Sequence, residues 1–403
     1  MSKATKTLTE DLLNTAGQTL LHTAHRPAIV MERGEGMYLW DTEGKSYLDF
    51  MGGWAVTSLG HSPAVLQEAL TRQAGELVLS SPAFYNKPMI ELAEQLTRLS
   101  GLDKVFFGST GAEANESAIK LARKHGSLNL NGAYEIITLT NSFHGRTLAT
   151  MSATGKPQWD TLFEPKVAGF KHVPINDFDA CFAAINDRTC AIMLELVQGE
   201  GGVHAVNGPY LQALRKACDI YGIMLIFDEV QTGIGRTGKL FAHEHYGVKP
   251  DVMTLAKGIG SGFPLSAMLT KDKFDLFEAG DQGGTYGGAP LAMAAGHAVV
   301  QEIIRSGLVE NAANMGNYLT ENLQQLSQAY PISGIRGKGL MLAFDVPENT
   351  AAALTACCLE LGLLVNAPKP STIRLTPPLI VTKQDIDDML VLLEQALNKL
   401  DLQ

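Results

Sequence analysis

Two segments of this 403-residue chain carry groups that could bind and activate a cofactor. In residues 107–116, Ser109 and Thr110 follow an apolar run and precede a helical pattern. Free backbone N–H groups at a helix start, together with these two hydroxyls, could hold a phosphate, although the pattern also fits an ordinary helix cap. Asp228 follows another apolar run, where a partly desolvated carboxylate could pair with a protonated ring nitrogen or cap a helix.

A lysine ends a third apolar run. Lys257 follows residues 252–256 and precedes three closely spaced glycines. Most lysines lie on the surface, but burial at a strand end lowers the lysine pKa and frees the amine for Schiff-base chemistry. A phosphate-binding turn, a carboxylate and an amine are together what pyridoxal phosphate (PLP) requires.

The elements that must position these groups alternate along the chain. From about residue 60 to 300, apolar runs of strand length alternate with amphipathic helical patterns, which predicts βαβ units and a mostly parallel sheet covered by helices. We expect strands at 104–107, 134–139, 191–197, 223–227, 252–256 and 265–269, and helices at 113–125, 209–221 and 291–304. After about residue 310 we expect a long helix, a strand pair at 337–346, a helix at 351–361, a strand at 373–375 and a final helix, which form a smaller α+β lobe. The first ~55 residues are typical of short strands around turns.

The composition argues against several other classes of protein. A net charge of −10 disfavours nucleic acid and anionic membranes as partners, and no run of 18 apolar residues could span a membrane. The five cysteines form no C-x-x-C pair, and residues 1–11 lack the apolar stretch of a signal peptide. The glycine-rich segment follows Lys257 instead of opening a first βα unit, so we set a nucleotide-binding Rossmann protein aside. We expect a cytoplasmic protein and assign no metal site.

The longest motif, residues 227–238, reads FDEVQTGIGRTG, and Lys257 follows downstream. Supporting motifs lie at 142–147, 198–202, 285–288 and 373–375. With these motifs the chain resembles a class III (ω-) aminotransferase, closest to the acetylornithine/ornithine aminotransferase group. The resemblance implies the α/β PLP fold type I (aspartate aminotransferase-like), with a mostly parallel sheet in its large domain. It also implies an N-terminal segment (1–60) that packs with the small domain, a large PLP-binding α/β domain (61–305) and a small C-terminal α+β domain (306–403).

The same resemblance gives five residues a role toward PLP. Lys257 corresponds to the lysine that carries PLP and moves the substrate proton, and Asp228 to the carboxylate that keeps the pyridine nitrogen protonated. Gln231 would contact the phenolic oxygen of the ring. Phe143 would stack on one ring face and Val230 on the other, although core packing is the commoner use of a phenylalanine.

The phosphate contacts imply a second subunit. Gly111 and Ala112 would donate backbone N–H groups to the phosphate of their own chain. Thr285 would reach the phosphate from the neighbouring subunit, so the resemblance implies a homodimer with shared active sites; an ordinary turn residue is the alternative for Thr285. We expect His144 to serve structure and give it no catalytic task.

Three charged residues would bind substrates. Arg146 resembles the residue that binds the distal carboxylate, and Arg374 the residue that binds the α-carboxylate of glutamate, since the planar guanidinium pairs with a carboxylate through two N–H donors. A surface ion pair is the alternative for either arginine. Glu200 resembles the carboxylate that pairs with Arg374 when an ω-amino substrate is bound. Two positions depart from the family pattern near the substrate: Gly284 lacks a hydroxyl, and Trp54 stands where a small aliphatic residue is usual.

The implied reaction moves the ω-amino group of N2-acetylornithine to 2-oxoglutarate, which gives N-acetylglutamate 5-semialdehyde and glutamate in arginine biosynthesis. Ornithine, succinylornithine and 4-aminobutyrate are alternative donors. A glutamate-semialdehyde aminomutase shares the fold, but Arg374 argues against it because a mutase need not accept glutamate. A non-catalytic relative is the third alternative, and the set Lys257, Asp228 and Gln231 argues against it.

Overall fold

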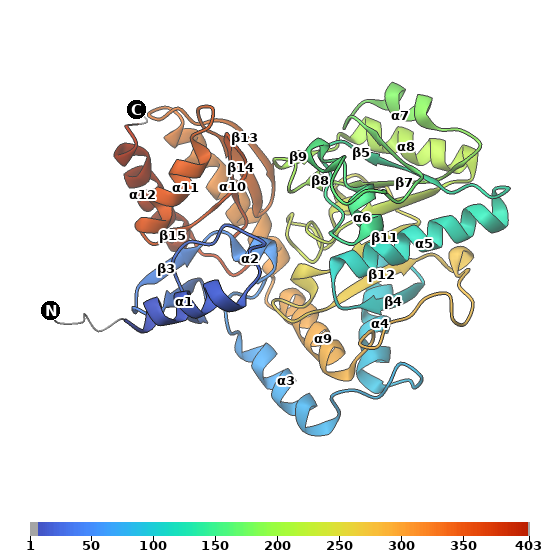
Figure 1. Ribbon diagram of the computed structural model, residues 1–403, viewed down its shortest axis with the longest axis horizontal. Helices are drawn as coiled ribbons and strands as arrows, with labels where there is room; N and C mark the ends of the chain where they lie inside the picture. The colour runs from blue at the N-terminus through green and yellow to red at the C-terminus, as the bar shows by residue number, and fades with distance from the viewer. Residues whose placement is uncertain (1–6, 402–403) are drawn as a thin grey trace.

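A seven-stranded sheet forms the centre of the larger of two lobes (Figure 1). In sheet order its strands are β4 (Lys104–Gly108), β12 (Ser266–Thr270), β11 (Val252–Leu255), β10 (Met224–Asp228), β7 (Thr189–Glu195), β5 (Glu135–Leu139) and β6 (Phe170–Val173). From β11 to β6 all neighbours are parallel, whereas β12 is antiparallel to both β11 and β4. The expected mostly parallel sheet is therefore confirmed. The computed structural model describes residues 7–401.

Helices cover both faces of this sheet, because its central strands are apolar on both sides. Ile226 of β10 lies in the buried cluster that includes α5 (Gly111–Asn129), and its neighbour Leu225 lies in the cluster that includes α8 (Gly208–Tyr221). This alternation follows from the two-residue repeat of a strand. The remaining longer helices of this lobe are α3 (Ala64–Glu76), α4 (Lys87–Ser100), α6 (Leu148–Ala153), α7 (Phe178–Ala184) and α9 (Pro290–Arg305). The six predicted strands and three predicted helices of this region are all present within a few residues.

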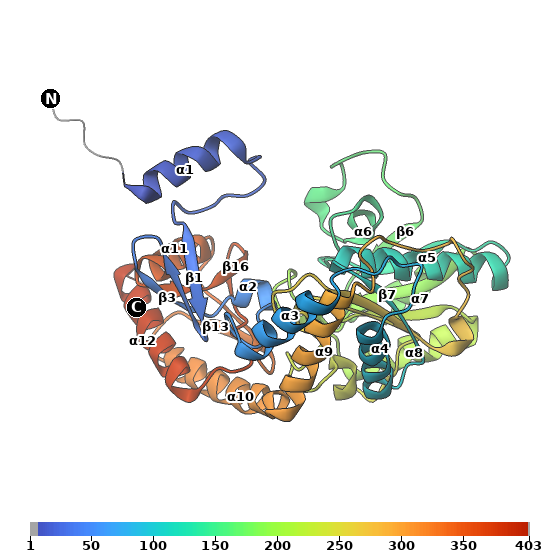
Figure 2. The same cartoon turned by 90° about the horizontal axis from the view of Figure 1, so that it is seen from below.

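Helix α1 (Leu8–Thr19) and strand β6 are among the elements that were not predicted. Helix α1 begins with a capping box, in which Thr7 Oγ1 accepts from Glu10 N (3.2 Å) and Glu10 accepts from Thr7 N (3.0 Å). Figure 2 shows α1 at the outer side of the smaller lobe. Strand β6 lies at the edge of the large sheet and only Val173 in it is buried, so it lacks the continuous apolar run of its neighbours.

The smaller lobe contains an antiparallel sheet in the order β13 (Ser333–Lys338), β14 (Met341–Asp345), β17 (Thr372–Leu375) and β16 (Asn366–Lys369). Its helices are α10 (Leu308–Leu326), α11 (Ala351–Glu360) and α12 (Lys383–Lys399). A second sheet joins β1 (Met31–Glu35), β2 (Tyr38–Asp41) and β3 (Ser46–Asp49) to β15 (Leu363–Leu364), which runs parallel to β3. The N-terminal strands therefore share a sheet with the C-terminal part of the chain.

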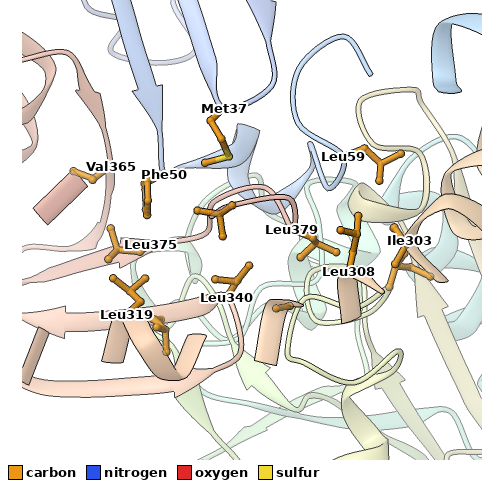
Figure 3. Close-up of a cluster of buried hydrophobic side chains, with 14 of the residues drawn as sticks. Met37, Phe50, Leu59, Ile303, Leu308, Leu319, Leu340, Val365, Leu375 and Leu379 are labelled. Atoms are coloured by element: carbon orange, nitrogen blue, oxygen red, sulfur yellow. The ribbon is translucent and has the colours of Figure 1, made fainter. Parts of the chain in front are cut away.

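The hydrophobic core beneath these sheets is drawn from distant parts of the sequence. Figure 3 shows Met37 and Phe50 from the N-terminal segment close to Leu340 and Leu375 from the C-terminal part. The same buried cluster continues through Ile303 of α9 into the larger lobe. The division of the chain near residues 60 and 305 remains a prediction. Within residues 7–401, no helix is long and apolar enough to cross a membrane.

Short elements complete the chain. They are α2 (Gly52–Ala55), β8 (Val197–Gln198), β9 (His204–Ala205) and the 3-10 turns η1 (Pro157–Trp159), η2 (Ala242–His245), η3 (Lys257–Ile259) and η4 (Asp272–Phe274).

Candidate active site

A cavity of about 410 Å3 opens at the carboxyl ends of the parallel strands β5, β7, β10 and β11, where open α/β sheets bind their ligands. Nine of the predicted site residues line it: Gly111, Ala112, Phe143, Arg146, Glu200, Asp228, Val230, Gln231 and Lys257. The fold thus brings these residues to one place, and their individual roles remain predictions.

The first turn of α5 presents free N–H groups to one end of the cavity. Thr110 caps the helix by accepting from Glu113 N (3.2 Å), and Glu113 Oε2 accepts from the N–H groups of Ser109 (2.9 Å) and Thr110 (2.8 Å). The N–H groups of Gly111 and Ala112 have no acceptor among the described residues. Such a helix start attracts a phosphate through both its N–H donors and the helix dipole.

Residue 111 has little room for a side chain. A Cβ atom on Gly111 would lie 2.8 Å from Cγ1 of Val230, which itself lines the cavity. The absence of a side chain at this position lets Val230 approach the backbone of the helix start. The glycine therefore sets the width of the cavity between this turn and Val230.

Asp228 is held in place by three hydrogen bonds at the end of β10. Its side chain is 3% exposed. Oδ2 accepts from Asn115 Nδ2 (2.8 Å) and lies 2.7 Å from His144 Nδ1, while Oδ1 accepts from Val230 N (3.0 Å). Asn115 also donates to His144 O (2.7 Å) and accepts from Thr254 Oγ1 (2.7 Å). His144, which we expected to serve structure only, and Asn115, which the sequence did not single out, therefore fix the position of this carboxylate.

Lys257 follows β11 in a left-handed backbone conformation (φ 46°). Burial first, and then the positive charge of Arg374, lower the pKa of its amine to about 8, against the opposite effect of Glu200 and Asp228. A larger fraction of this amine is neutral near pH 8 than for an ordinary lysine, which suits a nucleophile. A helix start for a phosphate, a fixed carboxylate and an amine of lowered pKa in one cavity form a donor set that fits PLP.

Arg374 lies behind this cavity and is covered by Glu200. The Arg374 side chain on β17 is 1% exposed, and its NH1 donates to Glu200 Oε1 (2.8 Å) and Gln231 Oε1 (3.3 Å) while NH2 donates to Asn366 Oδ1 (2.7 Å). Burial alone would raise the pKa of Glu200, but the Arg374 charge and hydrogen bond, helped by Lys257, bring that pKa below its usual value. Glu200 is therefore an anion that separates Arg374 from the cavity.

A group of aromatic and basic side chains extends from Phe143 and Arg146, which line the cavity, to Lys156 and Trp159. The Arg146 guanidinium lies 5.0 Å from the centre of the Trp159 ring, and the Lys156 ammonium lies 5.1 Å from the same ring and 5.0 Å from that of Phe143. Both cations are at the distance of cation–π contacts. Two positive charges in this group favour a substrate with a carboxylate there.

Glu195 is a site residue that the sequence did not identify. It ends β7 as Asp228 ends β10, and the two residues pair in register on neighbouring strands. Burial and then the negative charge of Asp228 raise the pKa of Glu195 to about 7, against the hydrogen bonds from Phe143 N (2.8 Å) and Gly199 N (3.2 Å). Glu195 thereby joins the loop of Phe143 to the loop of Glu200. Its only sequence signal is a carboxylate at the end of an apolar run, the same signal that identified Asp228.

Besides Arg374, three predicted residues lie outside the cavity of their own chain. Trp54 is 57% exposed, and Thr285 and Gly284 are also exposed. Gly284 lines a separate cavity of about 240 Å3 between residues 79–89 and 282–289. Within one chain these residues do not meet the other site residues.

Comparison with known proteins gives consistent results. The family model for class III aminotransferases matches residues 20–397. The chain is 48% identical over 383 residues to an acetylornithine aminotransferase of Caldanaerobacter subterraneus subsp. tengcongensis, with 94% of this chain and 98% of that protein covered. Among solved structures, it is similar to the acetylornithine aminotransferase of Elizabethkingia anophelis (35% identity, TM-score 0.87, 97% and 99% covered). It is also similar to a Toxoplasma gondii ornithine aminotransferase with partial occupancy of PLP at its active site (30% identity, TM-score 0.93, 98% and 95% covered).

Proposed function

The chain belongs to the class III aminotransferases, which are PLP-dependent transaminases, and from this premise we propose that it acts on N2-acetylornithine. The enzyme would transfer the terminal amino group of this donor to 2-oxoglutarate, with N-acetylglutamate 5-semialdehyde and glutamate as products in arginine biosynthesis. The relatives named acetylornithine aminotransferase, at 43–51% identity over most of the chain, support this donor.

When bound, PLP supplies a protonated ring that accepts the electron pair released as the substrate carbon loses its proton. In our proposal the Lys257 amine takes and returns that proton, and the Asp228 carboxylate holds the proton of the ring nitrogen. The N–H groups of Gly111 and Ala112 would bind the phosphate. Asn115 and His144 would keep the Asp228 oxygens aimed at the ring position.

The ring itself would be bound between two side chains. Phe143 and Val230 line the same cavity, and we propose that they pack against opposite ring faces. Gln231 would contact the phenolic oxygen. Because Gln231 also accepts from Arg374 (3.3 Å), this amide would join the cofactor position to the substrate carboxylate position.

The observation that carries the proposed substrate pair is the Glu200–Arg374 ion pair behind the cavity. An ω-amine presents methylenes near the reacting carbon, and a bare Arg374 there would be an unpaired buried charge. Glu200 neutralises Arg374 in that half-reaction, and the α-carboxylate of glutamate replaces Glu200 in the other. Arg146 would hold the distal carboxylate of either substrate.

The two positive charges beside Trp159 favour an acetylated donor over free ornithine. Ornithine would bring its α-ammonium close to Arg146 and Lys156, which are both cationic side chains against Trp159. N-acetylation removes that positive charge and keeps the carboxylate. Electrostatic repulsion therefore discriminates against ornithine while leaving acetylornithine unaffected.

We also propose a homodimer in which the partner's copy of Thr285 completes the phosphate site. Large apolar side chains are exposed at the loop that contains Gly284 and Thr285, and such exposure favours association. Leu79 and Phe84 line the same cavity as Gly284, and Tyr286 follows Thr285. A partner chain over this loop would cover them. We further propose a cytoplasmic location and domain boundaries near residues 60 and 305.

A panel of ω-amino donors with 2-oxoglutarate, compared by kcat/KM, tests the donor. We expect acetylornithine to exceed ornithine and 4-aminobutyrate by at least about tenfold, the effect of one charge contact. A preference for ornithine or 4-aminobutyrate would refute the proposed donor, and turnover without 2-oxoglutarate would indicate a mutase.

A further inference from the structure

Glu200 needs a second partner if it leaves Arg374. In the proposed function, the α-carboxylate of glutamate displaces Glu200 from the Arg374 guanidinium. The Glu200 side chain is only 26% exposed, so a displaced carboxylate without a partner would be a poorly solvated charge. The residues around Glu200 must therefore offer another cation for the switch to work.

Lys156 has the geometry of that cation. Its Nζ lies 3.9 Å from Glu200 Oε2, which is the oxygen that Arg374 does not bind. The Lys156 side chain is 13% exposed, and its ammonium has no hydrogen bond to any described residue. Its ammonium also lies 5.0 Å from the centre of the Phe143 ring and 5.1 Å from that of Trp159. Burial lowers the pKa of Lys156, and the negative charge of Glu200 opposes this effect.

The backbone beside Lys156 is fixed, so only the side chain needs to move. Gly155 forms a β-bridge with Thr140, and its N–H donates to Ser142 Oγ (3.0 Å). A Cβ atom on Gly155 would overlap the carbonyl oxygen of Leu139, so this segment packs tightly against the end of β5. Shortening the 3.9 Å separation to a hydrogen bond requires about 1 Å of side-chain movement.

We propose that Lys156 binds Glu200 when Glu200 leaves Arg374, and so acts as a positioning residue for the dicarboxylate half of the reaction. This proposal rests on the proposed function, because it assumes that one site accepts both glutamate and an ω-amine. Glu200 is then an anion shared between two cations: Arg374 holds it while an ω-amine is bound, and Lys156 holds it while a dicarboxylate occupies Arg374.

The competing role for Lys156 is direct contact with the distal carboxylate beside Arg146. Binding of glutarate to the PLP-loaded enzyme, followed by absorbance, separates the two roles because glutarate has both carboxylates and no amine. We expect Lys156→Met to raise the Kd of glutarate about tenfold, the value of one charged hydrogen bond. In the Glu200→Ala background, where no anion needs a new partner, Lys156→Met should change the Kd by less than about twofold.

The control is Lys369→Met. The Lys369 charge is close enough to lower the pKa of Lys156, but its amine donates to Asn141 Oδ1 (3.0 Å). This variant should leave the Kd of glutarate within about twofold of wild type. Lys156→Arg should retain wild-type binding, and Lys156→Gln repeats the test should the Met variant fold poorly.

An equal loss of glutarate affinity from Lys156→Met with and without Glu200 would overturn the proposal in favour of direct contact. Wild-type affinity in Lys156→Met would overturn it as well. A wild-type enzyme that does not bind glutarate at all would refute the proposed acceptor and the switch together. An unexpected donor preference with normal glutarate binding would refute only the proposed donor.

Discussion

Replacement of Glu200 by Ala should separate the two half-reactions. Without Glu200, the guanidinium of Arg374 keeps only neutral oxygen acceptors, on Gln231 at 3.3 Å and Asn366 at 2.7 Å. A charge-assisted hydrogen bond contributes about 1.5–3 kcal/mol. Because Glu200 keeps 26% exposure, we take the lower end, about 1.5 kcal/mol, which corresponds to roughly tenfold in affinity.

The sign of the effect differs between the two substrates. Glutamate no longer has to displace Glu200, so its half-reaction should gain about tenfold in apparent affinity. An ω-amine would exclude water from a guanidinium that has lost its anion, so the acetylornithine half-reaction should weaken. The kcat/KM ratio of glutamate to acetylornithine should therefore rise by at least about tenfold.

Single-turnover absorbance of each half-reaction measures this ratio directly. Glu200→Gln serves as the matched variant, because it retains an oxygen acceptor for Arg374 and removes only the charge; its ratio should lie between those of wild type and Glu200→Ala. Equal slowing of both half-reactions in Glu200→Ala would show that Glu200 has a structural role only.

Three further outcomes are expected. The pKa of Lys257 is lowered to about 8, so PLP should attach to the cofactor-free protein faster as the pH rises through about 8. A flat rate profile from pH 7 to 9 would contradict this. Borohydride reduction should leave PLP covalently attached to Lys257. Asp228→Asn should reduce kcat about 100-fold or more, as measured by stopped-flow absorbance of proton abstraction, and wild-type kcat would refute its role. If Thr285 completes the partner's phosphate site, sedimentation should show dimers at assay concentration and Thr285→Val should weaken PLP binding about tenfold, whereas a fully active monomer would exclude this role.

The sequence predicted the central strands of the larger lobe well because buried parallel strands are continuous apolar runs. Strand β6 was missed since it lies at the sheet edge and has one buried residue. Helix α1 was missed although Thr7 and Glu10 form a capping box that could have indicated it. Edge strands thus carry weaker patterns than the core.

The site was predictable only in part, for a different physical reason. Asp228 and Lys257 follow apolar strands within recognisable motifs. Their position at the carboxyl ends of the parallel strands therefore follows from strand direction. Asn115 and Lys156 contact the site through packing between segments far apart in the sequence, and a local pattern does not report such contacts. The role expected for Thr285 involves the phosphate site of a second chain, so it stays a prediction.

The pairing of β3 with β15 affects the order in which the protein can fold during synthesis. Leu48 pairs with Leu363, more than three hundred residues later in the chain. A ribosome that adds about 5–20 residues per second needs roughly 15 to 60 seconds to make the intervening segment. The N-terminal strands therefore remain without their edge partner, and Met37 and Phe50 without Leu375, until the chain is nearly complete. The larger lobe can form on the nascent chain during this interval, whereas the smaller lobe can close only at the end of translation.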